Sequence, residues 1–271
     1  MQTIKIITSK PISAKAYWKE IVKFRSLIWV FAQQELKTMY AQTYFGILWT
    51  VIRPLVTLMI FTIIFKFFLH VATQTPYYLF AFTGMIAWNL FSNITNNASS
   101  AIVQKQNLIR KMYFPKLILP LSKIIIACVE AGISFMILLL LMAYERVCFS
   151  VNLFTLPLFI LLNILCGYAV AIWMNALSIR FRDLNQILPT IIGIGVWVTP
   201  VFFPTTIIPA GYEAFVYANP MAGIIKGYRF ALLGEPFPEF FYWTSIFIMV
   251  AVMIVGTWYF SQVEDSMVDY A

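Results

Sequence analysis

Residues 117–143 read LILPLSKIIIACVEAGISFMILLLLMA, and the only charged side chains in this stretch are Lys123 and Glu130. A helix needs about 20 consecutive apolar residues to cross the hydrocarbon core of a bilayer, and this stretch is longer. Five other stretches meet or nearly meet that length. The sequence therefore predicts six transmembrane helices, over residues 47–69, 77–94, 117–143, 153–177, 187–203 and 240–260.

The composition also indicates that lipid is the solvent of this chain. Hydrophobic residues make up 61% of the sequence, charged residues make up 11%, and the mean hydropathy is +0.83. A soluble domain of this composition would expose large apolar patches. Because unpaired backbone groups are costly in hydrocarbon and no alternating strand pattern is present, we expect an all-α integral membrane protein.

The net charge of +8 follows the membrane topology rather than a nucleic-acid site, so we expect no nucleic-acid partner. Lys and Arg side chains gather before the first span, between the second and third spans, and after the fourth span. By the positive-inside rule, these segments and both termini would lie in the cytoplasm. The residues in question are Lys5, Lys10, Lys15, Lys19, Lys23, Arg25, Lys37, Lys105, Arg110, Lys111, Lys116, Arg180 and Arg182.

Residues 1–44 are basic and amphipathic, which is not the pattern of a cleavable signal peptide. Between Tyr17 and Tyr40, apolar residues recur at helical spacing while lysines occupy another face. We expect this helix to lie in the cytoplasmic interface of the membrane, or to pack on a soluble partner domain. Residues 45–262 would form the transmembrane domain and residues 263–271 a cytoplasmic tail.

Two segments outside the simple spans have patterns of their own. Residues 98–112 predict one cytoplasmic helix, which would either contact a partner or remain a solvated loop; Phe114 and Pro115 end it. The predicted span 187–203 contains prolines and glycines, so we expect it to be kinked or broken. Residues 204–239 are apolar but interrupted by Gly and Pro, which favours two short helices that dip into the outer leaflet.

The chain has no constellation typical of an enzyme. The only histidine, His70, has no nearby carboxylate or cysteine with which to form a dyad. No phosphate-binding loop, metal-binding motif or paired-cysteine motif occurs. We therefore expect no catalytic residue, no metal ligand and no cofactor bound by this chain. If the chain works against a gradient, ATP would have to be hydrolysed by another polypeptide.

Among the charged residues within the predicted spans, we interpret Arg53 and Glu130 as the exceptions to an uncharged membrane interior. Ionisable groups within a membrane usually face a cavity or each other. Arg53 lies close enough to the cytoplasmic end of its span to reach lipid headgroups. The sequence therefore leaves two hypotheses open for Arg53 and Glu130: a structural contact or a role in transport.

Aromatic residues make up 17% of the chain, and most would lie in the interfacial belts or against lipid. A minority that faced a pore would suit carbohydrate, because the apolar faces of sugars stack on aromatic rings. Such stacking, without tight hydrogen-bonding pockets, would let a long polymer slide. The candidates are Tyr77, Trp88, Trp197, Phe202, Phe203 and Tyr217.

Five motifs, spread in order along the chain, resemble the membrane subunit of ABC-2 type exporters, in particular the permeases that export O antigen and related polysaccharides or polyol phosphates. They are FRSLIWVFAQQELKTMYAQTYFGILWTVIRPL (24–55), QKQNLIRKMYFPKLILP (104–120), IRFRDLNQILP (179–189), TPVFFP (199–204) and NPMAGIIKGYR (219–229). No single motif is decisive, but the ordered set is fairly specific.

The resemblance implies a homodimer in the bacterial inner membrane, with each copy docked to a cytoplasmic subunit that binds ATP and Mg. The 98–112 helix would be the coupling helix, the helix from Tyr17 to Tyr40 an interfacial helix, and residues 204–239 a periplasmic gate. The first and fifth spans would flank a lateral opening for substrate. The coupling residues would be Gln104, Lys105, Asn107, Leu108, Arg110 and Lys111.

The expected substrate is a glycan carried on undecaprenyl pyrophosphate, within a membrane of ordinary lipids. Arginine and lysine side chains on the cytoplasmic side would attract the pyrophosphate. The candidates are Arg25, Lys37, Arg53, Arg180 and Arg182. Export of capsule or teichoic acid is the alternative within the family. An ATP-independent channel is an alternative of another class, and the lack of an acidic or histidine-centred site disfavours a membrane glycosyltransferase.

Overall fold

The computed structural model describes residues 14–41, 48–147, 151–178, 181, 183–209, 212, 214, 216 and 218–263, and within these residues all regular structure is helical. This confirms the all-α prediction. The elements are α1 (Ala14–Lys23), α2 (Arg25–Tyr40), α3 (Leu48–Thr62), the π-helix η1 (Ile63–Phe68), α4 (Tyr77–Ser99), α5 (Ala101–Gln104), α6 (Gln106–Ile109), α7 (Ile118–Tyr144), the 3₁₀ helix η2 (Val151–Thr155), α8 (Leu156–Ser178), α9 (Leu184–Val198), the 3₁₀ helix η3 (Thr205–Ile207), α11 (Pro220–Leu233) and α12 (Phe240–Val263).

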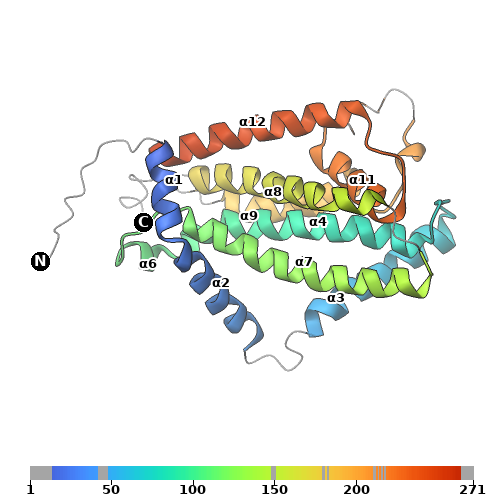
Figure 1. Cartoon of the computed structure of the whole chain (residues 1–271), viewed down its shortest axis with the longest axis horizontal. Coiled ribbons are helices and arrows are strands. Elements are labelled where there is room, and N and C mark those ends of the chain that lie inside the picture. The colour runs from blue at the N-terminus through green and yellow to red at the C-terminus, as the bar shows by residue number, and fades with distance from the viewer. Residues whose placement is uncertain are drawn as a thin grey trace, which may run out of the picture.

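The long helices α4, α7, α8 and α12 lie side by side and form the body of the molecule, while α1, α2 and α6 lie together at one end (Figure 1). Helix α4 is central because it packs against α7, α8 and α11, and most of its residues are buried. Helix α12 packs on α8, and α3 packs on α4 and α7. The buried hydrophobic core therefore lies around α4.

Four helical segments are long and apolar enough to cross a membrane, so the chain is a multi-pass membrane protein. They correspond to the predicted first, third, fourth and sixth spans. Their bounds are Leu48–Phe68, Ile118–Tyr144, Val151–Ser178 and Phe240–Val263.

The predicted second and fifth spans, which correspond to α4 and α9, are not among the helices long and apolar enough to cross a membrane. The count of six spans and the orientation of the chain in the membrane therefore stay predictions. Helix α4 is long, but it carries a series of hydroxyl and amide side chains on its buried surface. Helix α9 has 15 residues, a length of roughly 22 Å against a hydrocarbon core of about 30 Å. Its predicted end at residue 203 was wrong: the helix ends at Val198, and Thr199 is extended, the conformation favoured before Pro200.

Two helices predicted as continuous are interrupted in the structure. The helix expected from Tyr17 to Tyr40 is divided at Phe24 into α1, which packs on α12, and α2, which packs along α7. The single helix expected over 98–112 was also wrong, because α4 runs to Ser99 and is followed by the four-residue helices α5 and α6. Ser100 Oγ lies within hydrogen-bonding distance of Asn96 O, at 3.2 Å, a local contact that competes with regular helix.

The described part of residues 204–239 contains η3 and α11. Asn219 caps α11, since its side-chain oxygen accepts a hydrogen bond from Met221 N at 3.0 Å, and Pro220 occupies the first turn. Gly234 ends the helix with φ 72°, a left-handed conformation that favours glycine. Whether this segment forms a gate remains a prediction.

Candidate functional site

A cavity of about 590 Å³ lies between α3, α4, α7 and α9, and Met39 of α2 reaches its edge. Polar side chains come from three of these helices: Thr50, Arg53 and Thr57 from α3, Asn89 and Asn93 from α4, and Glu130 and Ser134 from α7. Trp49, Phe61, Trp88 and Phe202 supply aromatic surface. A cavity with aromatic walls and a few amide, hydroxyl and charged groups is typical of a site that binds a ligand.

Arg53 and Glu130 are the two charged residues among the described residues that line this cavity. The carboxylate of Glu130 accepts a hydrogen bond from Asn93 Nδ2 at 2.7 Å and interacts electrostatically with Arg53. Glu130 is half-buried and Arg53 is exposed. The structure therefore brings together two charges that lie far apart in the sequence and that the sequence placed separately in the membrane.

The predicted aromatic residues are only partly brought together. The ring of Phe61 stacks on Phe202 with the centroids 3.6 Å apart, and Tyr77 Oη donates a hydrogen bond to Phe202 O at 2.8 Å. Trp88 is 8% exposed and lines the cavity. Trp197 is 57% exposed, although its ring lies 5.6 Å from that of Phe61.

Of the other aromatic candidates, Phe203 is half-buried and does not line the cavity. Tyr217 lies outside the described residues. The aromatic cluster that the structure shows is therefore centred on Phe61, which the sequence did not single out. The missed signal is the four-residue spacing of Phe61, at the end of α3, and Phe65, in η1, because Phe65 also stacks near Phe202 with the ring centroids 6.0 Å apart.

Of the predicted phosphate-binding cations, Arg53 lines the cavity. Arg25 and Lys37 are exposed on α2 and do not line it. Arg180 and Arg182 lie outside the described residues. Among the three candidates that the structure describes, Arg53 is the one that lines the cavity.

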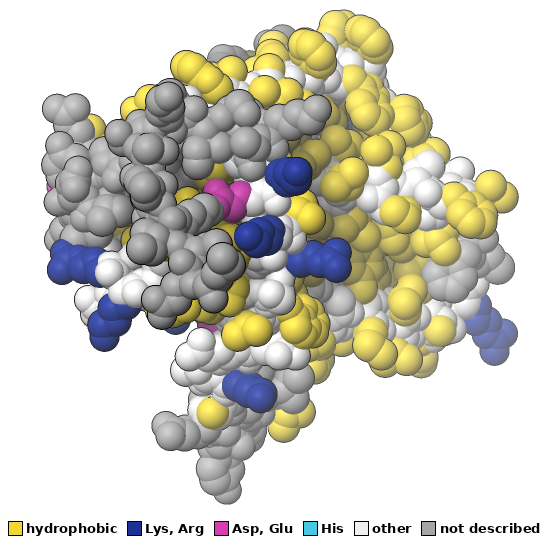
Figure 2. All heavy atoms as spheres, turned by 60° about the vertical axis from the view of Figure 1, so that its left-hand side comes forward, with side chains coloured by type: hydrophobic (Ala, Val, Ile, Leu, Met, Phe, Trp, Pro, Cys, Tyr) yellow, Lys and Arg dark blue, Asp and Glu magenta, His cyan; other side chains and the backbone are white. Residues whose placement is uncertain are grey.

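The predicted coupling residues lie in α5, α6 and the turn that follows, at the same end of the molecule as α1 and α2 (Figure 1). On the face shown in Figure 2, Lys and Arg side chains gather around this end, and hydrophobic side chains cover the flank beside it. Gln104, Asn107, Arg110 and Lys111 are exposed, while Lys105 and Leu108 are half-buried. The buried side chains of Ile102 and Ile109 anchor the segment in a hydrophobic cluster.

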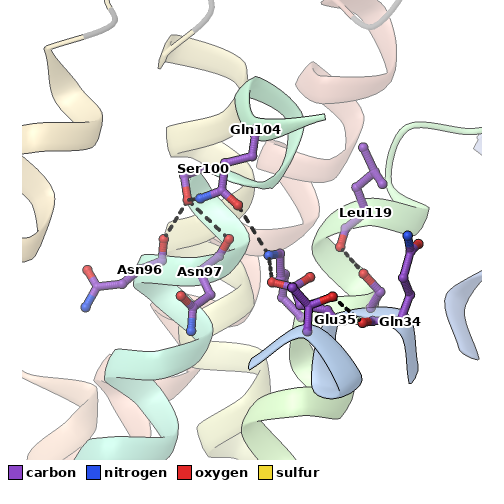
Figure 3. A network of polar contacts seen from close by, with 10 residues as sticks. Gln34, Glu35, Asn96, Asn97, Ser100, Gln104 and Leu119 are labelled. Atoms are coloured by element: carbon purple, nitrogen blue, oxygen red, sulfur yellow. Dashed lines mark hydrogen bonds and ion pairs between the residues drawn. The ribbon is translucent and has the colours of Figure 1, made fainter. Parts of the chain in front are cut away.

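The sequence missed the partner of Lys123, a residue of α7 that is only 4% exposed. Its ammonium group forms an ion pair with Glu35 of α2 and donates a hydrogen bond to Gln104 Oε1 at 3.4 Å. Gln104 Nε2 in turn donates to Ser100 Oγ at 2.8 Å, so the contacts join α2, α7 and α5 (Figure 3). The lysine within an apolar stretch indicates that a partner is needed, but the sequence pattern does not indicate that Glu35 is that partner.

The sequence also missed the burial of Arg229, whose side chain lies in α11 with 3% exposure. Its guanidinium donates hydrogen bonds to Pro200 O at 3.0 Å and to Val201 O at 2.6 Å, and it lies 3.4 Å from the ring centroid of Phe80. Arg229 therefore holds the turn after α9 against α11 and α4.

Arg229 also lines a second cavity, of about 510 Å³, together with Lys226, Glu235 and Glu239. Lys226 forms an ion pair with Glu239 at 2.7 Å. Burial raises the pKa of the Glu235 carboxyl above its ordinary value, and the positive charges of Arg229 and Lys226 act in the opposite direction. This second cavity is balanced in charge, with two cations and two carboxyl groups.

Similarity to known proteins extends over most of the chain. The O-antigen export system permease protein RfbA of Myxococcus xanthus is 26% identical over 253 residues, which cover 92% of this chain and 95% of the relative. An RfbA of Klebsiella pneumoniae is 27% identical over 209 residues, 75% of this chain and 78% of its own length. The polysialic acid transport protein KpsM of Escherichia coli is 25% identical over 210 residues, 74% of this chain and 78% of the relative.

The model of the ABC-2 type transporter family matches residues 26–233. The match runs from α2 to the end of α11 and includes both cavities except for the residues after α11. It covers well over half of the chain, and so the chain belongs to the ABC-2 type transporter family.

Proposed function

We propose that this chain is the membrane subunit of an exporter that moves a lipid-linked polysaccharide, such as O antigen, across the bacterial inner membrane. The observation that carries the proposal is the similarity to an O-antigen export permease over 92% of this chain and 95% of the relative. Four apolar spans, and a cavity lined by residues of two of them, support the same function.

The chemistry of the first cavity suits a lipid-linked glycan. The ring of Trp88 offers an aromatic face for a sugar, and the amides of Asn89 and Asn93 can exchange hydrogen bonds with hydroxyl groups. Arg53 offers a planar, bidentate donor to a phosphate oxygen pair. We assign the pyrophosphate of an undecaprenyl-linked glycan to Arg53, with Arg25, Lys37, Arg180 and Arg182 as cations that attract it from the cytoplasm.

The channel itself would form between two copies of the chain. Helices α3 and α9 carry many exposed apolar side chains, among them Met59 at 65% and Val198 at 69%, so lipid or a second copy must cover them. These two helices would flank the lateral opening through which the lipid-linked substrate enters. Residues 204–239 would form the periplasmic gate.

A separate cytoplasmic subunit, in two copies, would bind ATP and Mg and supply the energy. The segment from α5 to Lys111 is the proposed docking element, because it exposes polar side chains while Ile102 and Ile109 hold it to the bundle. Closure of the ATP-binding subunits would push on this segment and alter the channel.

Capsular polysaccharide is the second candidate for the cargo, and the 25% identity to the polysialic acid transport protein KpsM favours it. Teichoic acid is the third polymer of the same chemical kind. All three share a polyhydroxylated chain on a phosphate-bearing lipid, which is the chemistry that the cavity offers.

The cellular test is deletion of the gene in its own bacterium, followed by a measurement of surface polysaccharide. We expect the surface polymer to disappear while its lipid-linked form accumulates inside, and expression of the chain should restore export. Normal surface polysaccharide in the deletion strain would overturn the proposal.

A second experiment tests the need for a nucleotide-binding partner. The tagged chain should co-purify with an ATPase, and a substitution in the phosphate-binding loop of that ATPase should stop export. Export that persists with the inactive ATPase would favour an ATP-independent channel instead.

A further inference from the structure

The two charges of the first cavity differ in their direct contacts. Asn93 Nδ2 donates to the Glu130 carboxylate at 2.7 Å. The guanidinium of Arg53 makes no hydrogen bond or ion pair with any described residue; its contact with Glu130 is electrostatic, at longer range. The cavity therefore contains a positively charged group whose donors bond to no described residue, and a carboxylate that a neighbouring amide holds in place.

The surroundings of Arg53 indicate an amphiphilic ligand. Arg53 lies on α3 between apolar side chains that are exposed on the same helix, with Trp49 at 47%, Val56 at 50% and Met59 at 65%. A ligand that places an anionic head at Arg53 could lay a hydrocarbon chain along these residues. A lipid phosphate has both parts, whereas free inorganic phosphate has only the first.

Coulomb energies are larger at membrane depth than in water, because the effective dielectric constant is lower. With Arg53 and Glu130 both charged, the empty cavity is neutral. Binding of a phosphate at Arg53 then adds negative charge beside the carboxylate of Glu130. The carboxylate therefore opposes the ligand while the guanidinium attracts it.

We propose that Glu130 is a resident counter-ion of Arg53, which competes with the phosphate of a lipid headgroup and so keeps its binding at Arg53 weak. Asn93 acts as a positioning residue, because its amide holds the carboxylate within the cavity. A transporter has to release its cargo, and a built-in competitor shortens the lifetime of the bound state. The identity of the lipid as cargo rests on the proposed function, but the competition for phosphate does not.

The inference predicts opposite changes from two conservative substitutions. Glu130→Gln removes the competing charge and keeps the shape, so binding of a phosphate amphiphile should tighten by about tenfold, the effect of roughly 1.4 kcal/mol. Asn93→Leu removes the hydrogen bond that holds the Glu130 carboxylate in the cavity, so the competition should weaken and binding should tighten, by less than in E130Q. Arg53→Gln should instead weaken binding by about tenfold or more, and the double variant R53Q/E130Q should bind more tightly than R53Q but more weakly than E130Q.

The experiment is equilibrium binding of radiolabelled dodecyl phosphate to the purified full-length chain in phosphatidylcholine nanodiscs, with empty nanodiscs subtracted. Dodecyl maltoside is the neutral amphiphile, and inorganic phosphate tests the source of the anion. Glu145→Gln and Arg146→Gln are matched controls, because both residues lie at the exposed end of α7 outside the cavity. Neither control should change the binding.

Binding by E130Q that is equal to or weaker than binding by the unchanged chain would overturn the inference. If E130Q does not fold, N93L carries the test, and binding by N93L that is no tighter than binding by the unchanged chain would overturn it. Equal affinity for inorganic phosphate and dodecyl phosphate would overturn the lipid assignment. Export is measured separately in cells. A failure of the export test would therefore not contradict the binding results, and a failure of the binding predictions would not contradict the proposed export function.

Discussion

Lys123 of α7 and Glu35 of α2 form an ion pair in which the lysine side chain is 5% exposed and the glutamate side chain 26% exposed. The same ammonium group contacts Gln104, which lies in the proposed docking segment. The pair therefore fixes α2 and α5 to a helix that is long and apolar enough to cross the membrane. Because Lys123 is more deeply buried than Glu35, replacing one residue or the other should lower the stability of the protein by different amounts.

Glu35→Gln should lower the free energy of unfolding by about 3–5 kcal/mol, because it leaves the buried ammonium of Lys123 without its counter-ion. Lys123→Met should cost less, since Glu35 retains contact with solvent, and the double variant should be more stable than E35Q alone. Chemical unfolding of the detergent-solubilised protein measures these values. The control is the more exposed pair Lys226–Glu239, where E239Q should cost about 1 kcal/mol or less. If the stability loss of the K123M/E35Q double variant equals the sum of the losses of the two single variants, the ion pair does not contribute as described.

Gly227→Ala should destabilise the protein by about 1–3 kcal/mol through overpacking. A Cβ at this position would lie 2.1 Å from ring atoms of Phe159, and that ring is fully buried between α8 and α11. Gly193→Ala is the matched control, because a Cβ there meets nothing within 4 Å and alanine favours helix by roughly 0.5–1 kcal/mol. Thermal unfolding of both variants tests this, and equal midpoints would show that Phe159 can move aside.

Arg229→Met should loosen the turn after α9, because the carbonyl groups of Pro200 and Val201 lose their donor. Arg229→Lys should rescue only part of the effect, since an ammonium cannot reproduce the fork of a guanidinium. Hydrogen exchange of a peptide that covers residues 199–204 is the measurement, and exchange should be faster in R229M. Lys226→Met, on the same helix, should leave that peptide unchanged; equal exchange in all three variants would disprove the role of Arg229.

Stability should depend on pH through Glu235, whose pKa is raised by burial. Between the ordinary pKa of a glutamate and the raised value, the folded protein holds a proton that the unfolded chain has lost, so stability falls as pH rises through this window. Glu235→Gln removes this dependence. The difference in unfolding midpoint between E235Q and the unchanged protein should therefore grow in favour of E235Q as pH rises through this window, and a constant difference would refute it.

The sequence predicted the features that depend on composition and length. The all-helical class and the four apolar spans follow from runs of apolar residues, and the ordered motifs identified the family before any contact was known. Arg53 and Glu130 were recognised as charges inside spans. Their meeting in one cavity follows from the packing of α3 against α4 and α7, which no local pattern contains.

The errors arose where tertiary contacts override local pattern. The break at Phe24 separates two helices that pack on different partners, α12 and α7, although the apolar spacing continues through it. The predicted 98–112 helix is interrupted at Ser100 and at Lys105, where φ is −112° and ψ is 22°, while Ile102 and Ile109 on either side of Lys105 pack into one buried cluster. The burial of Arg229 depends on carbonyl groups some 28 residues away, so its position beside Lys226 in the sequence could not reveal it.

The most direct test of the central claim is reconstitution of the purified chain with its ATPase partner into liposomes that carry radiolabelled lipid-linked polysaccharide on the ATPase side. Added glycosidase, which cannot enter, reports how much polymer remains outside. We predict that ATP with Mg makes the polymer progressively resistant to the enzyme, and that liposomes without this chain show no such protection. Equal protection with and without the chain would contradict the claim that it provides the path for polysaccharide across the membrane.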